Sequence, residues 1–295
     1  MTGHTPVMTA EVLAQLRPER GGLYLDCTVG LGGHARALIE AGATRLIGLD
    51  RDNDALAQAR ETLLPWHDRV ELVHADYRSV DEVLDRCGAP LVDGALADLG
   101  LSSMQLEAPG RGFSFQRDEP LDMRMDRTSG DTAAALLARV DEQELADVIF
   151  RYGEERFSRR IARAIVAGRR EGAVETTGRL AAIVRRAVPR RGHMRIDPAT
   201  RTFQALRIWV NRELEGLDRF VESAARRLRA GARLVIITFH SLEDRIVKHT
   251  LRALERGGEA GIKVVTKRPL VPGEAEIARN PRARSAKLRA AERVG

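Results

Sequence analysis

The sequence has few cysteines, few aromatic residues and no long hydrophobic run. Only Cys27 and Cys87 are cysteines among 295 residues, too few for a disulfide framework or a cysteine-based zinc cluster. No apolar run approaches the roughly 18 residues that cross a bilayer, and residues 1–11 have neither the basic flank nor the apolar stretch of a signal peptide. We therefore expect a cytoplasmic protein with no membrane association and with reduced cysteines.

Lysine is also scarce, and the abundant arginines are unevenly distributed. The formal net charge is +6 and the sequence pI is about 9.9. Residues 1–150 hold 14 basic against 26 acidic side chains, whereas residues 151–295 hold 34 against 16. This asymmetry indicates a basic face for a polyanion, although arginines on long helices are also commonly a solvated surface.

Short apolar runs alternate with amphipathic segments in the first hundred residues. The runs, which we expect to be strands, cover residues 22–28, 45–50, 70–75 and 92–99. The expected helices between them cover residues 35–41, 53–63 and 79–86. Nearly continuous apolar strands are buried on both faces, and helices of this length serve as crossover connections. The pattern predicts a doubly wound α/β fold.

From about residue 107 to residue 207 helical patterns replace the strands. The expected helices cover residues 132–137, 142–152, 156–169 and 177–187, followed by a long helix at 199–229 that Gly231 ends. The sheet then resumes with a strand at 233–238, a helix at 242–255, a surface loop at 269–281 and short strands at 262–267 and 285–292. We accordingly divide the chain into a first part (1–106), a helical insertion (107–207) and a second part (208–295).

A glycine-rich segment, Asp26-Cys-Thr-Val-Gly30-Leu-Gly32-Gly33-His34, follows the first expected strand. Glycines let the backbone approach a ligand, whose polar groups can then meet free N–H groups at the start of the next helix. Asp50 ends the second strand, 17 residues after Gly33, where a carboxylate can accept hydrogen bonds from both hydroxyls of a ribose. The combination predicts an adenosine-type cofactor, whereas the glycines alone would favour a simple tight turn.

The choice of cofactor depends on the residues around this loop. A strict G-x-G-x-x-G is absent, and the acidic start at Asp26 favours S-adenosylmethionine over a dinucleotide. The third strand ends in Asp76-Tyr77, where the carboxylate could accept from the adenine amine and the ring could lie against the base. A capping aspartate beside a half-buried tyrosine is the alternative for this pair.

Asp98 ends the fourth strand, at the sheet edge where open α/β folds place their reacting groups. It could accept a hydrogen bond from an exocyclic amine and orient the amine lone pair toward an electrophilic methyl group, or it could cap the following turn. Parallel strands would bring His240 beside Asp98, either in the substrate pocket or as a helix-start histidine. The basic segment 280–287 suits phosphate contact or is an ordinary strand edge.

Two other chemistries find no support in the sequence. The segment Gly100-Leu-Ser102-Ser103-Met is not G-x-S-x-G, which argues against a serine hydrolase. The seven histidines form no H-E-x-x-H or similar motif, so we expect no metal.

Eight segments, in order, resemble one known family. They are Gly-Leu-Gly-Gly-His (30–34), Asp-Leu-Gly-Leu-Ser-Ser (98–103), Arg-Gly-Phe-Ser-Phe (111–115), Pro-Leu-Asp-Met-Arg-Met-Asp (120–126), Tyr-Gly-Glu-Glu-Arg-Phe (152–157), Ala-Thr-Arg-Thr-Phe-Gln-Ala (199–205), Phe-His-Ser-Leu-Glu-Asp-Arg (239–245) and Asn-Pro-Arg-Ala-Arg-Ser (280–285). From about residue 4 to residue 293 the chain resembles the bacterial 16S rRNA (cytosine-N4)-methyltransferases of the RsmH (MraW) family.

The resemblance implies a class I S-adenosylmethionine-dependent methyltransferase with a Rossmann-like, seven-stranded, mostly parallel sheet and an inserted all-helical domain that helps recognise RNA. By motif, it implies cofactor contacts from the residues Gly32, Gly33 and His34 at the methionine end, Asp50 at the ribose, and also Tyr77, Asp98 and Gln105. The implied reaction adds one methyl to the N4 amine of a cytosine in the decoding region of 16S rRNA.

Several points stay open in the sequence. The Asn/Asp-Pro-Pro-aromatic motif of many amino-methyltransferases is replaced here by Asp98-Leu-Gly-Leu, so their catalytic geometry does not transfer. The expected partner is 16S rRNA, naked or in the small ribosomal subunit, and a homodimer is left open. A DNA amino-methyltransferase and a non-catalytic RNA-binding module are the alternative functions.

Overall fold

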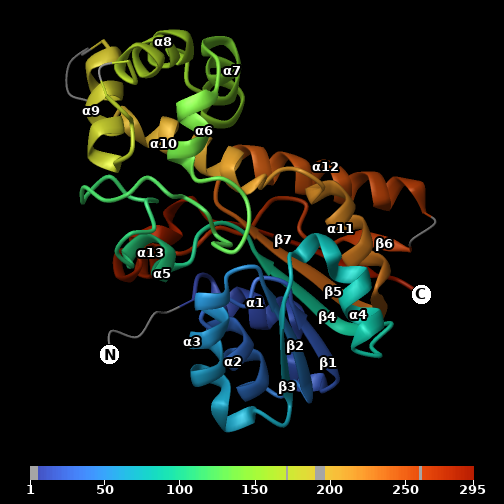
Figure 1. Cartoon of the computed structure of the whole chain (residues 1–295). Coiled ribbons are helices and arrows are strands. Elements are labelled where there is room, and N and C mark those ends of the chain that lie inside the picture. The colour runs from blue at the N-terminus through green and yellow to red at the C-terminus, as the bar shows by residue number, and fades with distance from the viewer. Residues whose placement is uncertain (1–5, 171, 190–196, 259–260) are drawn as a thin grey trace. The chain divides into compact units, whose positions relative to one another are not determined.

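The computed structural model describes residues 6–170, 172–189, 197–258 and 261–295 (Figure 1). The chain folds into two compact units, each with its own core. The first unit combines Met1–Gly100 with Leu214–Gly295, and the second is Leu101–Glu213. No helix in the described ranges is both long and apolar enough to cross a membrane.

The first unit is built on a seven-stranded sheet with the order β3-β2-β1-β4-β5-β7-β6. Its strands are β1 (Leu23–Asp26), β2 (Arg45–Asp50), β3 (Val70–His74), β4 (Val92–Asp98), β5 (Leu228–Thr238), β6 (Ile262–Val264) and β7 (Lys287–Arg293). All neighbouring strands pair in parallel except β7, which is antiparallel to both β5 and β6. The predicted fold class is thereby confirmed.

Helices cover both faces of this sheet (Figure 1). They are α1 (Thr9–Leu16), α2 (Gly33–Glu40), α3 (Asn53–Leu63), α4 (Val80–Arg86), α11 (Leu217–Arg226) and α12 (Ser241–Gly257), and the same unit also contains α13 (Glu274–Arg279), none of whose residues is buried. Leu25 and Ile47 pack in a core with side chains of α4, α11 and α12, whereas Tyr24 and Leu46 pack with α1, α2 and α3. Because successive strand residues point to opposite faces, burial on both sides explains the continuous apolar runs.

The sheet topology creates a place for a ligand. β1 lies between β2 and β4, so the chain winds outward in opposite directions from this pair of strands. Open α/β sheets bind ligands at such a switch point, beyond the carboxyl ends of the strands. Asp26, Asp50 and Asp98 each end a strand at this edge.

The second unit is helical. It contains α5 (Ser103–Glu107), α6 (Ala133–Arg139), α7 (Glu142–Gly153), α8 (Ser158–Gly168), α9 (Thr177–Ala187) and α10 (Ala199–Asn211). The apolar faces of α6 to α10 share one core, to which Ile149, Ile165, Leu180 and Phe203 contribute. The only β-pairing in the described part of this unit is a single bridge between Pro120 and Thr176.

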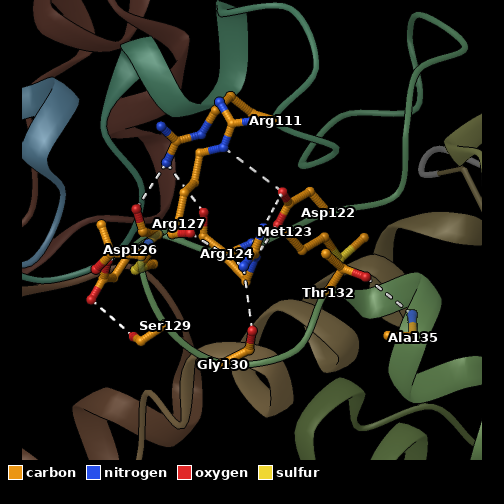
Figure 2. A network of polar contacts seen from close by, with 12 residues as sticks. Arg111, Asp122, Met123, Arg124, Asp126, Arg127, Ser129, Gly130, Thr132 and Ala135 are labelled. Atoms are coloured by element: carbon orange, nitrogen blue, oxygen red, sulfur yellow. Dashed lines mark hydrogen bonds and ion pairs between the residues drawn. The ribbon is translucent and has the colours of Figure 1, made fainter.

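An ordered segment without regular structure precedes α6 in the second unit (Figure 2). Buried Arg111 donates to the carbonyls of Arg124 and Met125, at 3.2 and 3.0 Å. Arg124 in turn forms a two-pronged ion pair with Asp122, at 2.7 and 3.0 Å. Asn211 of α10 accepts from the Met125 N–H and donates to the carbonyl of Met123, both at 2.7 Å. Side chains therefore provide the hydrogen bonds that regular structure would otherwise supply.

Two expectations about the second half of the chain are wrong. The long helix expected at 199–229 is two helices, because Arg212 adopts the left-handed conformation (φ 52°) and Gly216 (φ +69°) precedes α11. Gly231 lies inside β5, which starts at Leu228, because an irregularity in the β4–β5 pairing accommodates extra residues before Arg233.

Three short helices were also not foreseen. The expected surface loop at 269–281 contains α13, and both α1 and α5 fall where no helix was predicted. α13 is polar and six residues long, so its sequence has no apolar periodicity that could reveal it. Its Glu276 accepts a hydrogen bond from the Met8 N–H at 2.6 Å, a contact between distant parts of the chain.

Candidate active site at the strand ends of the sheet

The glycine-rich loop between β1 and α2 forms a tight turn. The Gly32 N–H donates to the Val29 carbonyl at 2.8 Å, and Gly32 is the residue that precedes α2. Its φ of +85° lies in the left-handed region, and a Cβ there would lie 3.2 Å from the Leu63 side chain. Only glycine fits this position without strain. A Cβ on Gly33 would lie 3.1 Å from Pro6, so the N-terminal segment packs closely on the loop.

Asp50 is fixed to this loop through its carboxylate. One oxygen accepts from the Gly30 N–H and the other from the Asp52 N–H, each at 2.8 Å. Each oxygen keeps a further lone pair, so both can still accept from a ligand hydroxyl. Burial raises the pKa of Asp50 to about 6, an effect that the two backbone hydrogen bonds only partly oppose. The geometry is compatible with the ribose contact expected of Asp50.

Three ionisable side chains, Asp26, His34 and Asp98, form a largely buried cluster beside the loop. Asp26 is 1% exposed, His34 is 6% exposed and the Asp98 side chain is 23% exposed. The His34 Nε2 lies 3.5 Å from an Asp98 carboxylate oxygen, and the Asp98 N–H donates to the Thr28 hydroxyl at 2.7 Å. β1, α2 and β4 thus each contribute one member of the cluster.

The cluster has perturbed proton affinities. Burial raises the pKa of Asp26 to about 7, against the opposing charge of His34. Burial alone would lower the pKa of His34, but the carboxylates of Asp98 and Asp26 outweigh it, and this pKa is raised. Perturbed groups of this kind at a sheet edge are typical of functional sites.

Several polar atoms of the cluster have no hydrogen-bond partner among the described residues. They are Asp26 Oδ2, Asp98 Oδ1 and both ring nitrogens of His34. Leaving a buried polar atom unpaired costs about 1–3 kcal/mol, so such atoms call for a ligand. The Asp26 oxygen and the imidazole match the ammonium and carboxylate of an amino acid. The residues therefore fit the methionine end of S-adenosylmethionine.

Asp76 and Tyr77 follow β3 and make contacts within the protein. The Asp76 carboxylate accepts from Arg78 Nε and Nη2, both at 2.7 Å. Burial would raise the pKa of Asp76, but the hydrogen bonds from Arg78 outweigh it and this pKa is lowered. The Tyr77 ring packs at 4.6 Å from the Phe220 ring, tilted by 51°. Asp76 is thus engaged within the protein, and the adenine contacts of both residues stay predictions.

His240 lies immediately before α12, as the helix-start histidine considered above. Its Nδ1 accepts from the Glu243 N–H at 3.4 Å, and its Nε2 lies 3.1 Å from the Glu243 carboxylate. The β4–β5 register pairs Asp98 with Ile237, so β5 ends beside Asp98, as parallel pairing predicted. A role for His240 in the substrate pocket stays a prediction.

Gln105 belongs to the second unit, in the first turn of α5. Its side-chain oxygen accepts from the Ser102 N–H at 3.0 Å, and its own N–H donates to the Ser102 hydroxyl at 3.2 Å. This reciprocal capping fixes the start of α5. A cofactor contact from Gln105 stays a prediction.

Sequence reasoning missed two contributors to the site. Thr28 carries no prediction from the sequence, yet its hydroxyl accepts from the Asp98 N–H and fixes that backbone. Glu276 lies in the unforeseen α13, and its charge adds to the raised pKa of His34. No spacing or periodicity connects residue 276 to the loop at 26–34, so the sequence held no signal for it.

Comparison with known proteins gives full-length similarity. The sequence matches the profile of the MraW methylase family over residues 1–294. It is 50% identical to the ribosomal RNA small subunit methyltransferase H of Nitratidesulfovibrio vulgaris (strain DP4), over 99% of this chain and 95% of that protein. The protein of the same name from Sorangium cellulosum (strain So ce56) is 51% identical over 99% and 91%. Among solved structures, an rRNA methylase from Streptococcus thermophilus is similar at a TM-score of 0.44 and 11% sequence identity. The similarity covers 100% of this chain and 99% of that protein.

Proposed function

The chain belongs to the MraW methylase family, and from this premise we propose that it methylates the exocyclic N4 amine of a cytosine in the decoding region of 16S rRNA. The names of its relatives, which specify ribosomal RNA of the small subunit, support the substrate class. The observation that carries the proposal is the cluster of Asp26, His34 and Asp98 at the switch point, four of whose buried polar atoms have no hydrogen-bond partner in the part of the chain that the structure describes.

The methyl donor is S-adenosylmethionine, which supplies an electrophilic methyl group on a sulfonium when bound. Gly32, Gly33 and His34 would hold its methionine end, together with Asp26. Asp50 would accept from the ribose hydroxyls with the lone pairs that its backbone hydrogen bonds leave free. Tyr77, Asp98 and Gln105 complete the proposed cofactor contacts.

Asp98 is the proposed catalytic residue. The lone pair of the cytosine amine is delocalised into the ring, which makes the nitrogen a poor nucleophile. Asp98 Oδ1, which is buried and has no partner within the described chain, would accept a hydrogen bond from the amine and favour a pyramidal nitrogen. With S-adenosylmethionine bound, the amine would take the methyl group directly and release one N–H proton, so no covalent bond to the chain would be needed. The protein's main contributions are alignment and exclusion of water.

The substrate must reach a recessed site. A base held in a stack cannot present its amine at the sheet edge, so the cytosine has to be unstacked first. His240, next to the end of β5, is the proposed pocket residue for the unstacked base. The helical unit is proposed to hold the surrounding RNA.

A labelling experiment tests this function. The protein is incubated with methyl-labelled S-adenosylmethionine and with either small ribosomal subunits or naked 16S rRNA from cells that do not carry the modification. We expect label in N4-methylated cytidine after digestion to nucleosides. If small subunits are the better substrate, the enzyme recognises the assembled particle, and if naked 16S rRNA is better, it recognises the RNA alone. Label in another nucleoside, or none despite cofactor binding, would contradict the proposal. Competing duplex DNA that removed the label would favour a DNA amino-methyltransferase.

A further inference from the structure

The arginines of the helical unit are of two kinds. Some are used internally: Arg169 donates to the Leu137 and Val140 carbonyls at the end of α6, at 2.9 and 2.6 Å. Arg179 similarly donates to carbonyls at the end of α8 and just beyond it. Others are exposed and, within the ranges that the structure describes, have no carboxylate or carbonyl partner. Arg159 and Arg160, both on α8, are of this second kind.

Exposed arginines form a stripe along α8. Arg159 and Arg160 are followed by Arg163 at helical spacing, so the three side chains share one face, and Arg156 extends the row just before the helix. We call these four residues the α8 stripe. Arg163 is 76% exposed although it lies 3.3 Å from Glu142. The opposite face of α8 is buried in the core of the unit. At about 5.4 Å per helical turn, the stripe is a row of closely spaced cations.

A high arginine content alone would spread basic and acidic side chains over all the helices, and this is not what the helical unit shows. α8 and α9 contain no acidic residue, whereas α7, which packs against α8, carries Glu142, Glu144 and Asp147. Charge is therefore sorted by helix rather than scattered. Arg190, Arg191 and Arg195, which add to the basic excess of the insertion, lie outside the described residues.

The position of the stripe also opposes helix stability. Arg159 and Arg160 stand in the first turn of α8, where no acidic residue is present. The positive end of the helix dipole disfavours cations in that turn by about 0.3–1 kcal/mol each. A polyanion lying on the stripe would reverse this penalty, because phosphates are favoured both by the helix start and by guanidinium groups.

We propose that the α8 stripe holds backbone phosphates of the rRNA substrate. The inference rests on the proposed function and assigns its RNA contact to one helix face. Arginine forks pair with phosphate oxygens without reading bases, so the stripe positions the RNA and leaves selection of the cytosine to the active site. Its effect is therefore on RNA affinity rather than on the chemical step.

A paired charge-removal experiment on the full chain tests the proposal. Arg159→Gln/Arg160→Gln removes two stripe cations, and Arg252→Gln/Arg256→Gln removes two exposed arginines from α12 as the matched control. Binding of a labelled 16S rRNA transcript is measured over a range of salt concentrations, with methylation kinetics alongside. For the stripe variant we expect about tenfold weaker RNA binding and a matching rise in KM. We expect its log–log salt slope to be shallower by about 1.5, the value for two lost phosphate contacts.

The other readouts separate the possible failures. kcat and the Kd for S-adenosylmethionine should stay at the wild-type values, and Arg159→Lys/Arg160→Lys should keep the wild-type salt slope. Equal effects of the stripe and control variants, or a lysine pair that loses the slope, would overturn the α8 assignment. A wild-type chain that methylates no rRNA, yet shows the expected binding pattern, would instead defeat the proposed function alone.

Discussion

The site residues lower the stability of the ligand-free protein and at the same time favour ligand binding. They are Asp26, His34 and Asp98. Each has at least one buried polar atom with no hydrogen-bond partner among the described residues, which a stable core would not tolerate. The same atoms are already oriented for a charged ligand, so binding needs little rearrangement of the protein. Functional sites commonly leave buried polar groups without partners for this reason.

The cluster makes the stability of the ligand-free protein depend on pH. Asp26 has a pKa of about 7 in the folded chain against 3.8 as its ordinary value, so the folded state binds more protons between these pH values. The free energy of unfolding should therefore fall as pH rises from about 4 to about 7, by on the order of 4 kcal/mol from Asp26 alone. Asp50, with a pKa raised to about 6, adds to the fall between about pH 4 and 6, and the raised pKa of His34 extends it above about pH 6.5. Urea unfolding across this range measures the slope.

Asp26→Asn is the variant for that measurement, since an amide of the same shape cannot ionise. Roughly half of the slope should disappear in it, because Asp50, with a pKa of about 6, contributes over the lower part of the same range. A wild-type slope that Asp26→Asn leaves unchanged would show that Asp26 is not the titrating group.

Cofactor affinity should depend on the ionisation of Asp50. Its pKa is about 6, and the protonated carboxyl has less capacity to accept from ribose hydroxyls. The affinity for S-adenosylmethionine should therefore rise with pH through about 6, and in the wild type it should rise again through about 7 as Asp26 ionises. Calorimetric titration at several pH values should show the first step in the wild type and in Asp26→Asn, but not in Asp50→Asn. A first step that persists in Asp50→Asn would assign it to another group.

Among helices and strands, the sequence predicted the elements whose pattern is local. The strands β1 to β4 are short apolar runs bounded by turn residues, and the glycine loop follows directly from β1. The break between α10 and α11 escaped prediction because apolar residues continue at helical spacing on both sides of it. α13 escaped because a contact between Glu276 and Met8, distant in sequence, helps hold it.

Gly216 should be essential to that helix break. Its φ is +69°, and a Cβ there would lie 3.4 Å from the Arg78 side chain. Gly216→Ala should therefore cost about 1–2 kcal/mol of unfolding free energy. Gly257→Ala is the control, because Gly257 lies in α12 with nothing near its Cβ position, and it should be neutral or stabilise by up to about 1 kcal/mol. Equal effects in urea unfolding would refute the strain argument.

Asn211 should stabilise the ordered segment that precedes α6. Asn211→Ala removes its hydrogen bonds to Met123 and Met125, and leaves their buried backbone groups unpaired. We expect a loss of about 2–4 kcal/mol in urea unfolding. Gln204→Ala, which removes one bond to the Tyr152 carbonyl, should cost about 1 kcal/mol or less. A loss for Asn211→Ala no larger than for Gln204→Ala would contradict this account.

Across the chain, chemistry and charge are divided between segments. The acidic first half supplies Asp26, Asp50 and Asp98 at one sheet edge, and the basic second half supplies the α8 stripe. The site's members could be predicted because strand-end residues of a parallel sheet share an edge. Their hydrogen bonds could not, because the Asp50–Gly30 link and the Thr28–Asp98 link depend on strand register.

The most direct test of the account is the nucleoside content of 16S rRNA in cells whose only copy of this protein carries Asp98→Ala. If Asp98 orients the cytosine amine, N4-methylated cytidine should be present in cells with the wild-type protein and absent with the variant, at equal protein levels. The modification at wild-type level in the variant cells would contradict the assignment of Asp98. Its absence from the wild-type cells would contradict the proposed reaction itself.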